Sequence, residues 1–303
     1  MSKAENIFVN VNDLMKMEGH ANSFHNFCQP RKVKQILGGS YFSTMRGRGL
    51  EFEEVRNYIA GDDIRNIDWK VTARTHKIHS KVFSEEKEKP TMIILDQQAS
   101  MFFGTEKHMK SKIGSELAAI ISFWTLKEGD RVGGIVISND HFPATPAKRD
   151  RKNILQFFNQ IQNCNKAVQS GNITENPMDL KLIFDQVNQV ITHDFLVVII
   201  SDFHRYDPNV VHRIGELKQH NDVVLAKVND PLEREIPKSK FILGSKGKQL
   251  IYDGRKSSLR KSHQETSNKN SNDFIQRMNS LNIPVLEMNT VEDTNDQLKK
   301  LIL

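Results

Sequence analysis

The chain has 303 residues, of which 38% are hydrophobic and 26% charged, and its formal net charge is +6. This length suffices for about two domains, and the interleaving of both charge signs predicts a mixed, solvated surface rather than a nucleic-acid-binding one. Apolar runs are too short for a membrane helix, the N-terminus does not look like a signal peptide, and the two cysteines lack metal-site spacing. We therefore expect a cytoplasmic protein without a membrane span.

Residues 1–89 show no regular alternation of strands and helices. A short helix is predicted over 6–16 and a strand over 78–83, where the side chains alternate in character. Between them, residues 47–74 combine many opposite charges with Phe, Tyr, Ile and Trp. This mixture indicates an ordered segment, called the charged block below.

From residue 91 onward, strands and helices alternate. Strands are predicted over 91–96, 130–138, 195–202, 222–228 and 285–288, with a return strand near 139–145 and a hairpin over 241–253. Helices are predicted over 107–127, 151–162, 179–192, from 207, over 273–281 and from 293. The polar stretch 255–272 is predicted to be a flexible loop, and its role is open. The alternation predicts an α/β fold with a mostly parallel sheet covered by helices on both faces.

Two of the predicted strands end in a carboxylate, Asp96 and Asp202. Ligands of open parallel sheets bind beyond the carboxyl ends of the strands. Together with Ser100, in the loop after the first strand, these residues could supply part of an oxygen ligand set for Mg²⁺. The alternative is that both carboxylates cap the loops or helices that follow, and spacing alone favours that interpretation.

The charged block also has two interpretations. Its acidic residues could serve a metal-dependent hydrolase or nuclease that uses Asp62, Asp63 and Asp68. Arginines are interleaved with them at similar density, and arginine pairs with carboxylates through two hydrogen bonds. We favour a self-neutralising network over a partner-binding surface for this set: Arg48, Glu51, Arg56, Asp62, Asp63, Arg65, Asp68, Trp69 and Arg74.

Motifs of common enzymes are missing from the sequence. It contains neither a glycine-rich phosphate loop nor the Gly-x-Ser-x-Gly elbow of hydrolases, and its histidines are scattered. A non-enzymatic function is therefore expected.

The charged block resembles the signature of the DUF58 family of bacterial proteins. The resemblance is clearest in Gly61-Asp62-Asp63, Arg65, Ile67-Asp68-Trp69 and Ala73-Arg74, and it continues at Asp230-Pro231-Leu232-Glu233. In that family the block precedes a von Willebrand factor A-like, Rossmann-like domain. The resemblance therefore implies an N-terminal, partly β extension over residues 1–87 and a von Willebrand A-like domain over 88–303.

The resemblance also implies a metal-binding motif. The metal-ion-dependent adhesion site of von Willebrand A domains begins with Asp-x-Ser-x-Ser, which is matched here by Asp96 and Ser100, with Gln98 in place of the first Ser. Asp202 matches a later ligand of the site, and the expected Thr has no clear counterpart. A degenerate adhesion site is implied, with Mg²⁺ as the ion if one binds.

A partner is implied in the same way. Similar proteins are typically encoded beside MoxR-type AAA+ ATPases and are thought to act with them on other complexes. The resemblance thus implies an adaptor or co-chaperone-like protein that docks on such an ATPase and serves an unknown client protein.

Overall fold

The computed structural model describes residues 8–27, 50–85, 89–170, 178–204, 206–234, 238–245, 248–253 and 255–302. Contacts between residues divide the chain into two units. The hairpin unit is Tyr41–Lys89, and the sheet unit combines Met1–Ser40 with Pro90–Leu303. The first helix, α1 (Val11–Phe27), packs on α4 and α5 of the sheet unit. The division expected from the sequence, 1–87 and 88–303, stays a prediction.

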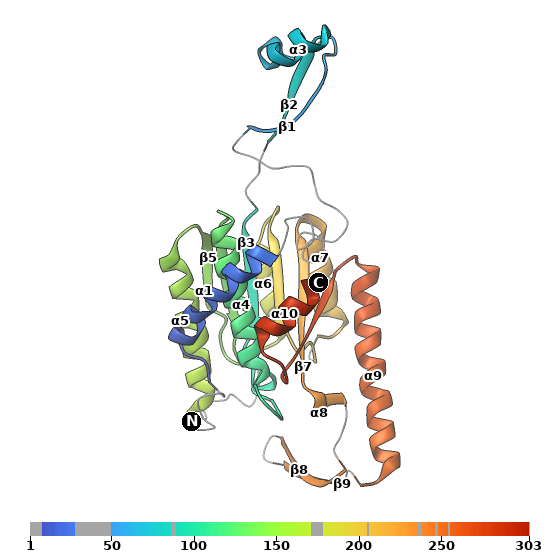
Figure 1. The fold of residues 1–303 in the computed structure, drawn as a ribbon. Helices are drawn as coiled ribbons and strands as arrows, with labels where there is room; N and C mark the ends of the chain where they lie inside the picture. The colour runs from blue at the N-terminus through green and yellow to red at the C-terminus, as the bar shows by residue number, and fades with distance from the viewer. Residues whose placement is uncertain are drawn as a thin grey trace. The chain divides into compact units, whose positions relative to one another are not determined.

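A six-stranded sheet with the strand order β10-β7-β6-β3-β4-β5 forms the centre of the sheet unit (Figure 1). Its parallel strands are β3 (Thr91–Asp96), β4 (Val132–Ile137), β6 (Leu196–Ser201), β7 (Asp222–Asn229) and β10 (Val285–Asn289). At one edge, β5 (Ala144–Lys148) runs antiparallel to β4. Strands β3 and β4 are buried along their whole length, as expected of parallel strands that are covered on both faces. The predicted α/β fold is confirmed.

Helices cover both faces of this sheet. One apolar core joins the sheet to α1, α4 (Lys110–Lys127), α5 (Arg151–Gln169) and α10 (Thr294–Ile302). The core on the other face joins it to α6 (Leu180–Val190), α7 (Pro208–His220) and the end of α9 (Ser257–Ser280). A short helix, α8 (Pro231–Arg234), follows β7. Among the described helices, none combines the length and hydropathy needed to cross a bilayer.

Three parts of the sheet unit test the predicted element boundaries. The predicted hairpin is present as β8 (Lys240–Ser245) and β9 (Lys248–Asp253). Helix α1 begins later than predicted and extends to Phe27. The predicted loop over 255–272 is wrong, because most of it belongs to α9. The first turns of α9 lack an apolar stripe, so the hydrophobic periodicity of the sequence did not indicate a helix there. Hydrogen bonds to other elements help to hold α9 in place. Ser267 Oγ donates to the Glu233 carbonyl (2.8 Å), and Lys227 Nζ donates to Ser271 Oγ (2.7 Å).

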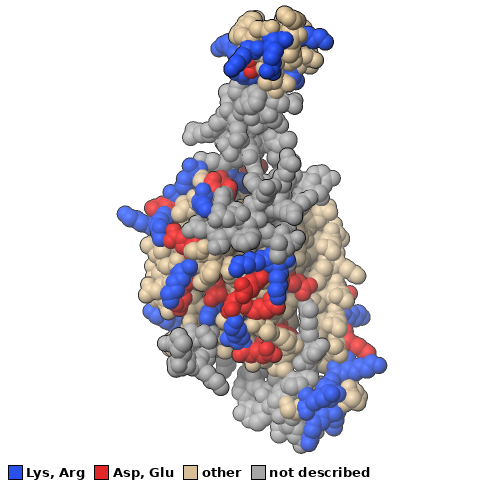
Figure 2. All heavy atoms as spheres, in the orientation of Figure 1, with Lys and Arg blue, Asp and Glu red and all other residues tan. Residues whose placement is uncertain are grey.

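The hairpin unit consists of two antiparallel strands with a short helix between them. Strand β1 (Leu50–Asn57), which the sequence did not predict, pairs with β2 (His79–Glu85), which it did. A single 3₁₀ turn (Ile64–Asn66) and α3 (Trp69–Thr75) lie between the strands. Figure 2 shows mainly basic and uncharged side chains on the drawn face of this unit.

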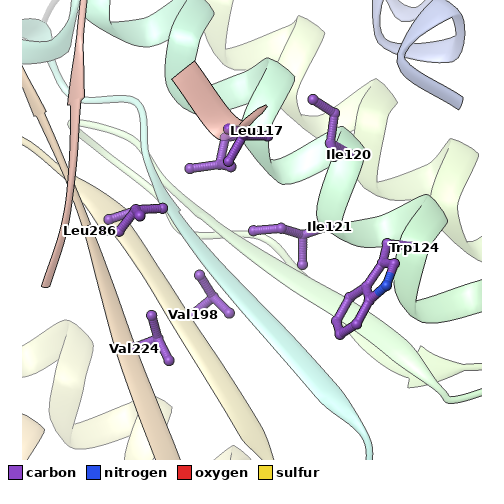
Figure 3. A pocket seen from close by; sticks show the side chains of 9 residues that line it. Leu117, Ile120, Ile121, Trp124, Val198, Val224 and Leu286 are labelled. Carbon is purple, nitrogen blue, oxygen red and sulfur yellow. The ribbon is translucent and has the colours of Figure 1, made fainter. Parts of the chain in front are cut away.

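A small cavity lies in the sheet unit between α4 and the sheet (Figure 3). Leu117, Ile121 and Trp124 of α4 line it from one side, and Val198 and Val224 line it from the sheet. Its volume is about 20 Å³, close to that of one water molecule, and its lining is apolar. We regard it as a packing gap rather than a ligand site.

Candidate functional site

The carboxyl ends of β3 and β6 lie side by side where the strand order of the sheet reverses. β3 pairs with β4 on one side and with β6 on the other. Asp96 ends β3, and Asp202 directly follows β6. Both residues are buried, with exposed fractions of 3% and 2%. The two strand-end carboxylates are thus at the edge where ligands of open α/β sheets bind.

Asp96 is hydrogen-bonded within the protein through both carboxylate oxygens. Its Oδ2 accepts from the Ser201 hydroxyl at 2.7 Å, and its Oδ1 accepts from the backbone N–H of Gln98 at 2.9 Å. The Ser201 hydroxyl in turn accepts from the backbone N–H of Phe203 at 3.1 Å. These bonds tie the end of β3 to the end of β6, which is the geometry of a capping residue.

The loop after β3 is anchored toward β4. Gln98 is buried, and its Nε2 lies 3.4 Å from the carbonyl oxygen of Ser138. The backbone N–H of Ala99 donates to Asn139 Oδ1 at 3.2 Å. Ser100 is half-buried in the 3₁₀ turn Ala99–Met101. The Gln98 amide therefore serves as a loop anchor in this arrangement.

Lys110 is the buried cation of this edge. It is the first residue of α4, and its side chain is 1% exposed. Its Nζ lies 2.8 Å from Asp202 Oδ2 and 2.5 Å from Glu233 Oε1, with the ring centroid of Phe103 at 5.8 Å. Burial alone would lower the pKa of Lys110, but the carboxylates of Asp202 and Glu233 raise it above its usual value. Lys110 is therefore an ammonium ion at neutral pH.

His204 joins the same group from the loop after β6. Its Nε2 lies 3.2 Å from Glu233 Oε1, and its backbone N–H donates to Asp202 Oδ1 at 3.1 Å. The hydrogen bond with Glu233 raises the pKa of the imidazole, which is about half exposed. The other oxygen of Glu233 accepts from the backbone N–H of Asp230 at 3.1 Å. We call Lys110, Asp202, His204 and Glu233 the Lys110 cluster.

Three members of this cluster have the side chains of a metal site. Asp202, His204 and Glu233 each offer one ligand atom, and these atoms lie within 4.8 Å of one another. In the described part of the chain, no other trio of His, Cys, Asp and Glu residues does so. However, the Lys110 ammonium contacts two of the three, and it would repel a divalent ion placed there. The residues therefore do not fit a resident Mg²⁺ while Lys110 is in place.

Asp230 holds together the loops beside the Lys110 cluster. It is fully buried and accepts hydrogen bonds from Thr105 (backbone N–H 2.9 Å, hydroxyl 2.7 Å), the Thr290 hydroxyl (2.6 Å) and the backbone N–H of Leu232 (2.9 Å). Burial alone would raise the pKa of Asp230, but the hydroxyls of Thr290 and Thr105 and the backbone donors lower it. The loop after the 3₁₀ turn Ala99–Met101, helix α8 and the end of β10 thus meet at one carboxylate.

The aspartates of the charged block are bonded within the hairpin unit. Asp62 accepts two hydrogen bonds from the Arg56 guanidinium, at 2.9 and 2.8 Å, and these lower the pKa of its carboxyl group. Asp63 accepts from the backbone N–H of Arg65 at 3.0 Å. Asp68 caps α3 by accepting from two backbone N–H groups, both at 3.0 Å. A two-metal hydrolase would need such carboxylates free of these donors, so the geometry gives that alternative no support.

The remaining predicted residues of the block differ in their surroundings. Arg48 and the side chain of Glu51 lie outside the described residues. Arg74 has no ion-pair partner among the residues that the structure describes. Trp69 is 67% exposed at the start of α3. The self-neutralising network therefore includes Arg56 with Asp62 and Arg65 with Asp63 (3.3 Å), and it does not include Arg74.

Sequence reasoning missed Lys110 and the part that Glu233 plays. Lys110 lies 123 residues before Glu233 in the chain, and nothing distinguishes it from the neighbouring Lys107 and Lys112 before folding. The one available signal was Asp230-Pro231-Leu232-Glu233, which was noted as an element of the resemblance without a role.

The chain is similar in sequence to proteins from mycobacteria. Three curated relatives are 28% identical to the chain over 208 residues: the uncharacterized proteins Rv1480 and MT1527 of Mycobacterium tuberculosis and Mb1516 of Mycobacterium bovis. Each match covers 68% of this chain and 63% of the relative, so the chain spans less than two thirds of their length.

Similar solved structures include BatB from Bacteroides thetaiotaomicron (12% identity, TM-score 0.39, covering 71% of this chain and 97% of that one). The SpRpn10 VWA domain is another (11% identity, TM-score 0.37, covering 71% and 94%). The sheet has one antiparallel edge strand and helices on both faces, which is the α/β arrangement that the resemblance implied. The model of the family described as "Protein of unknown function DUF58" matches residues 54–273, and since this is more than half of the chain, the protein belongs to the DUF58 family.

Proposed function

We propose that this protein is a non-enzymatic protein-interaction module that binds a MoxR-type AAA+ ATPase through its hairpin unit. The observation that carries the proposal is a set of exposed apolar side chains. Seven large hydrophobic residues are exposed in the described structure, and four of them belong to the hairpin unit: Ile59, Ile64, Trp69 and Ile78. Exposed aromatic and aliphatic groups concentrated in a small unit are typical of protein-binding surfaces.

The charges around Trp69 indicate what the partner surface must offer. Lys70, Arg74 and Lys77 are exposed and have no ion-pair partner within the described residues, whereas the aspartates of the block are bonded. Lys70 and Arg74 are four positions apart on α3, so they share one side of that helix. An acidic patch beside an apolar recess would complement this surface. We therefore propose that the ATPase contributes such a patch.

The carboxyl edge of the sheet supports a structural role better than a docking role. A metal-ion-dependent adhesion site needs an open coordination position for the partner. Here Asp202 is buried and bonded to Lys110, and Asp96 is bonded to Ser201. We therefore do not include Mg²⁺ or the degenerate adhesion site in the proposed contact. Binding to a AAA+ ATPase implies a cytoplasmic location for this protein. The proposal does not specify the client protein.

The Trp69→Ala variant is expected to bind the ATPase about 30-fold more weakly than the wild type, because a central interface Trp typically contributes about 2 kcal/mol or more. Each MoxR-type ATPase of the source organism would be purified, and its affinity measured by calorimetry with and without chelator. The Lys70→Glu/Arg74→Glu variant is expected to lose affinity as well and to show a weaker salt dependence.

The matched control is Leu182→Ala, since Leu182 is 56% exposed on α6 of the sheet unit. Its affinity is expected to stay within about twofold of the wild type, as for most surface truncations outside a contact. Equal affinity of the wild type and Trp69→Ala would show that the ATPase does not bind at the surface around Trp69. If none of the purified ATPases binds the wild type, the proposed partner is wrong.

A further inference from the structure

We propose that the ammonium group of Lys110 is the resident cation of the carboxyl edge and that the wild-type Lys110 cluster binds no divalent ion. The inference concerns the Lys110 cluster alone and does not depend on the proposed docking of the hairpin unit. It rests on the position, burial and contacts of one lysine and on the ligand groups around it.

The contacts of Lys110 are those of a bound cation. Its Nζ lies 2.8 Å from Asp202 Oδ2 and 2.5 Å from Glu233 Oε1, and only 1% of its side chain is exposed. The two carboxylates are 2% and 17% exposed, so they are held away from water together with the ammonium. A divalent ion could enter only if Lys110 lost its proton or moved away, and moving would leave a charged group unpaired in the interior.

The lysine side chain connects three elements of the sheet unit. It extends from the start of α4 to Asp202 after β6 and to Glu233 in α8, which follows β7. Since the cation is covalently part of α4, these three elements are held together at any concentration of free metal. The strand-end Asp96 contacts Ser201 and Gln98 instead, so the expected ligand pair, Asp96 and Asp202, is engaged by two different sets of donors.

Removing the ammonium should turn the cluster into a metal site. Asp202, His204 and Glu233 would then keep two carboxylate oxygens and one imidazole nitrogen within 4.8 Å of one another. The two carboxylate oxygens suit Mn²⁺, and the imidazole nitrogen offers a third ligand atom. We therefore expect that the wild type binds no divalent ion and that Lys110→Ala binds one.

The test is a Mn²⁺ titration of the full chain. Binding is measured by calorimetry and by the electron paramagnetic resonance signal of free Mn²⁺, and the effect on stability is measured by thermal unfolding. Lys110→Ala is expected to bind Mn²⁺, and at about 100 times its Kd the melting temperature should rise by about 5 °C. The wild type and the matched control Lys112→Ala should show no such shift. The Lys110→Ala/Asp202→Asn variant should lose both the Mn²⁺ binding and the rise in melting temperature, because it lacks one of the three ligand groups.

Two results would overturn the inference. One is Mn²⁺ or Mg²⁺ binding by the wild type that Asp202→Asn abolishes, because the ammonium would then not occupy the ion's place. The other is a folded Lys110→Ala variant that binds no Mn²⁺. If Lys110→Ala does not fold, the inference is tested by titrating the wild type and Asp202→Asn. Absence of ion binding that depends on Asp202 would support the inference, and presence of such binding would contradict it.

Discussion

Replacing Lys110 by alanine is expected to lower the free energy of unfolding by about 3–5 kcal/mol, as for other variants that remove one partner of a buried ion pair. The substitution leaves the carboxylates of Asp202 and Glu233 without the ammonium that lies 2.8 and 2.5 Å from them. Both must then become protonated or stay charged in a site that is largely closed to water, and either outcome costs stability. The measurement is urea unfolding at neutral pH.

The control for this prediction is Lys112→Ala on the same helix. Lys112 is more exposed than Lys110 (15% against 1%) and lies 3.9 Å from Glu116, a longer contact than those of Lys110, so a smaller loss than in Lys110→Ala is expected. Asp202→Asn and the double variant Lys110→Ala/Asp202→Asn complete a double-mutant cycle. We expect a coupling energy of about 1–3 kcal/mol between the two residues. A loss in Lys110→Ala no larger than that in Lys112→Ala would contradict the burial of this charge.

Replacing Asp230 by asparagine is expected to lower the free energy of unfolding by about 2–3 kcal/mol at pH 7. The carboxylate accepts hydrogen bonds from Thr105, Thr290 and the backbone of Leu232, and the amide group of Asn can accept at only one of its two ends. Its NH₂ end would face a donor, which leaves buried polar groups unpaired. Chemical unfolding of the two proteins at the same pH measures the difference.

The difference in unfolding free energy between the wild type and Asp230→Asn should become smaller at low pH. The pKa of Asp230 is lower in the folded protein than its ordinary value, so its contribution to stability is fully present above the unfolded pKa of about 3.9. That contribution is lost as the pH falls through the folded pKa. The gap between wild type and Asp230→Asn should therefore stay constant from pH 7 to about pH 5 and narrow only below about pH 4.

A second carboxylate serves as the control for this prediction. Asp194, whose side chain is 80% exposed, undergoes the same chemical change in Asp194→Asn without the buried donors. Its effect is expected to be within about 0.5 kcal/mol at every pH. A gap for Asp230→Asn that is already narrowing at pH 6 would mean that the carboxyl group is not stabilised as the contacts indicate.

The sequence by itself determined the sheet unit well, because the relevant signals are local. Strand β3 begins and ends at the predicted residues 91 and 96, and its side chains are all buried. Helix α7 begins at Pro208 with Asp207 as its cap, as predicted from two neighbouring residues. The order of such elements was enough to predict a mostly parallel sheet. Helix α9 was missed over its first turns because a polar helix has no periodic apolar signal, and its partners, such as Glu233, are distant in the chain.

Only the tertiary structure decided what the carboxyl edge is. The sequence placed Asp96 and Asp202 at the carboxyl ends of two strands, and the structure shows that these strands are neighbours. It could not show that Asp96 bonds to Ser201 or that the first lysine of α4 reaches Asp202 and Glu233, which lie 92 and 123 residues away. Which of several similar lysines becomes buried depends on how helices pack on the finished sheet. A residue's own type and its neighbours in the chain do not carry that information, and the charge at the centre of this edge therefore appears only on folding.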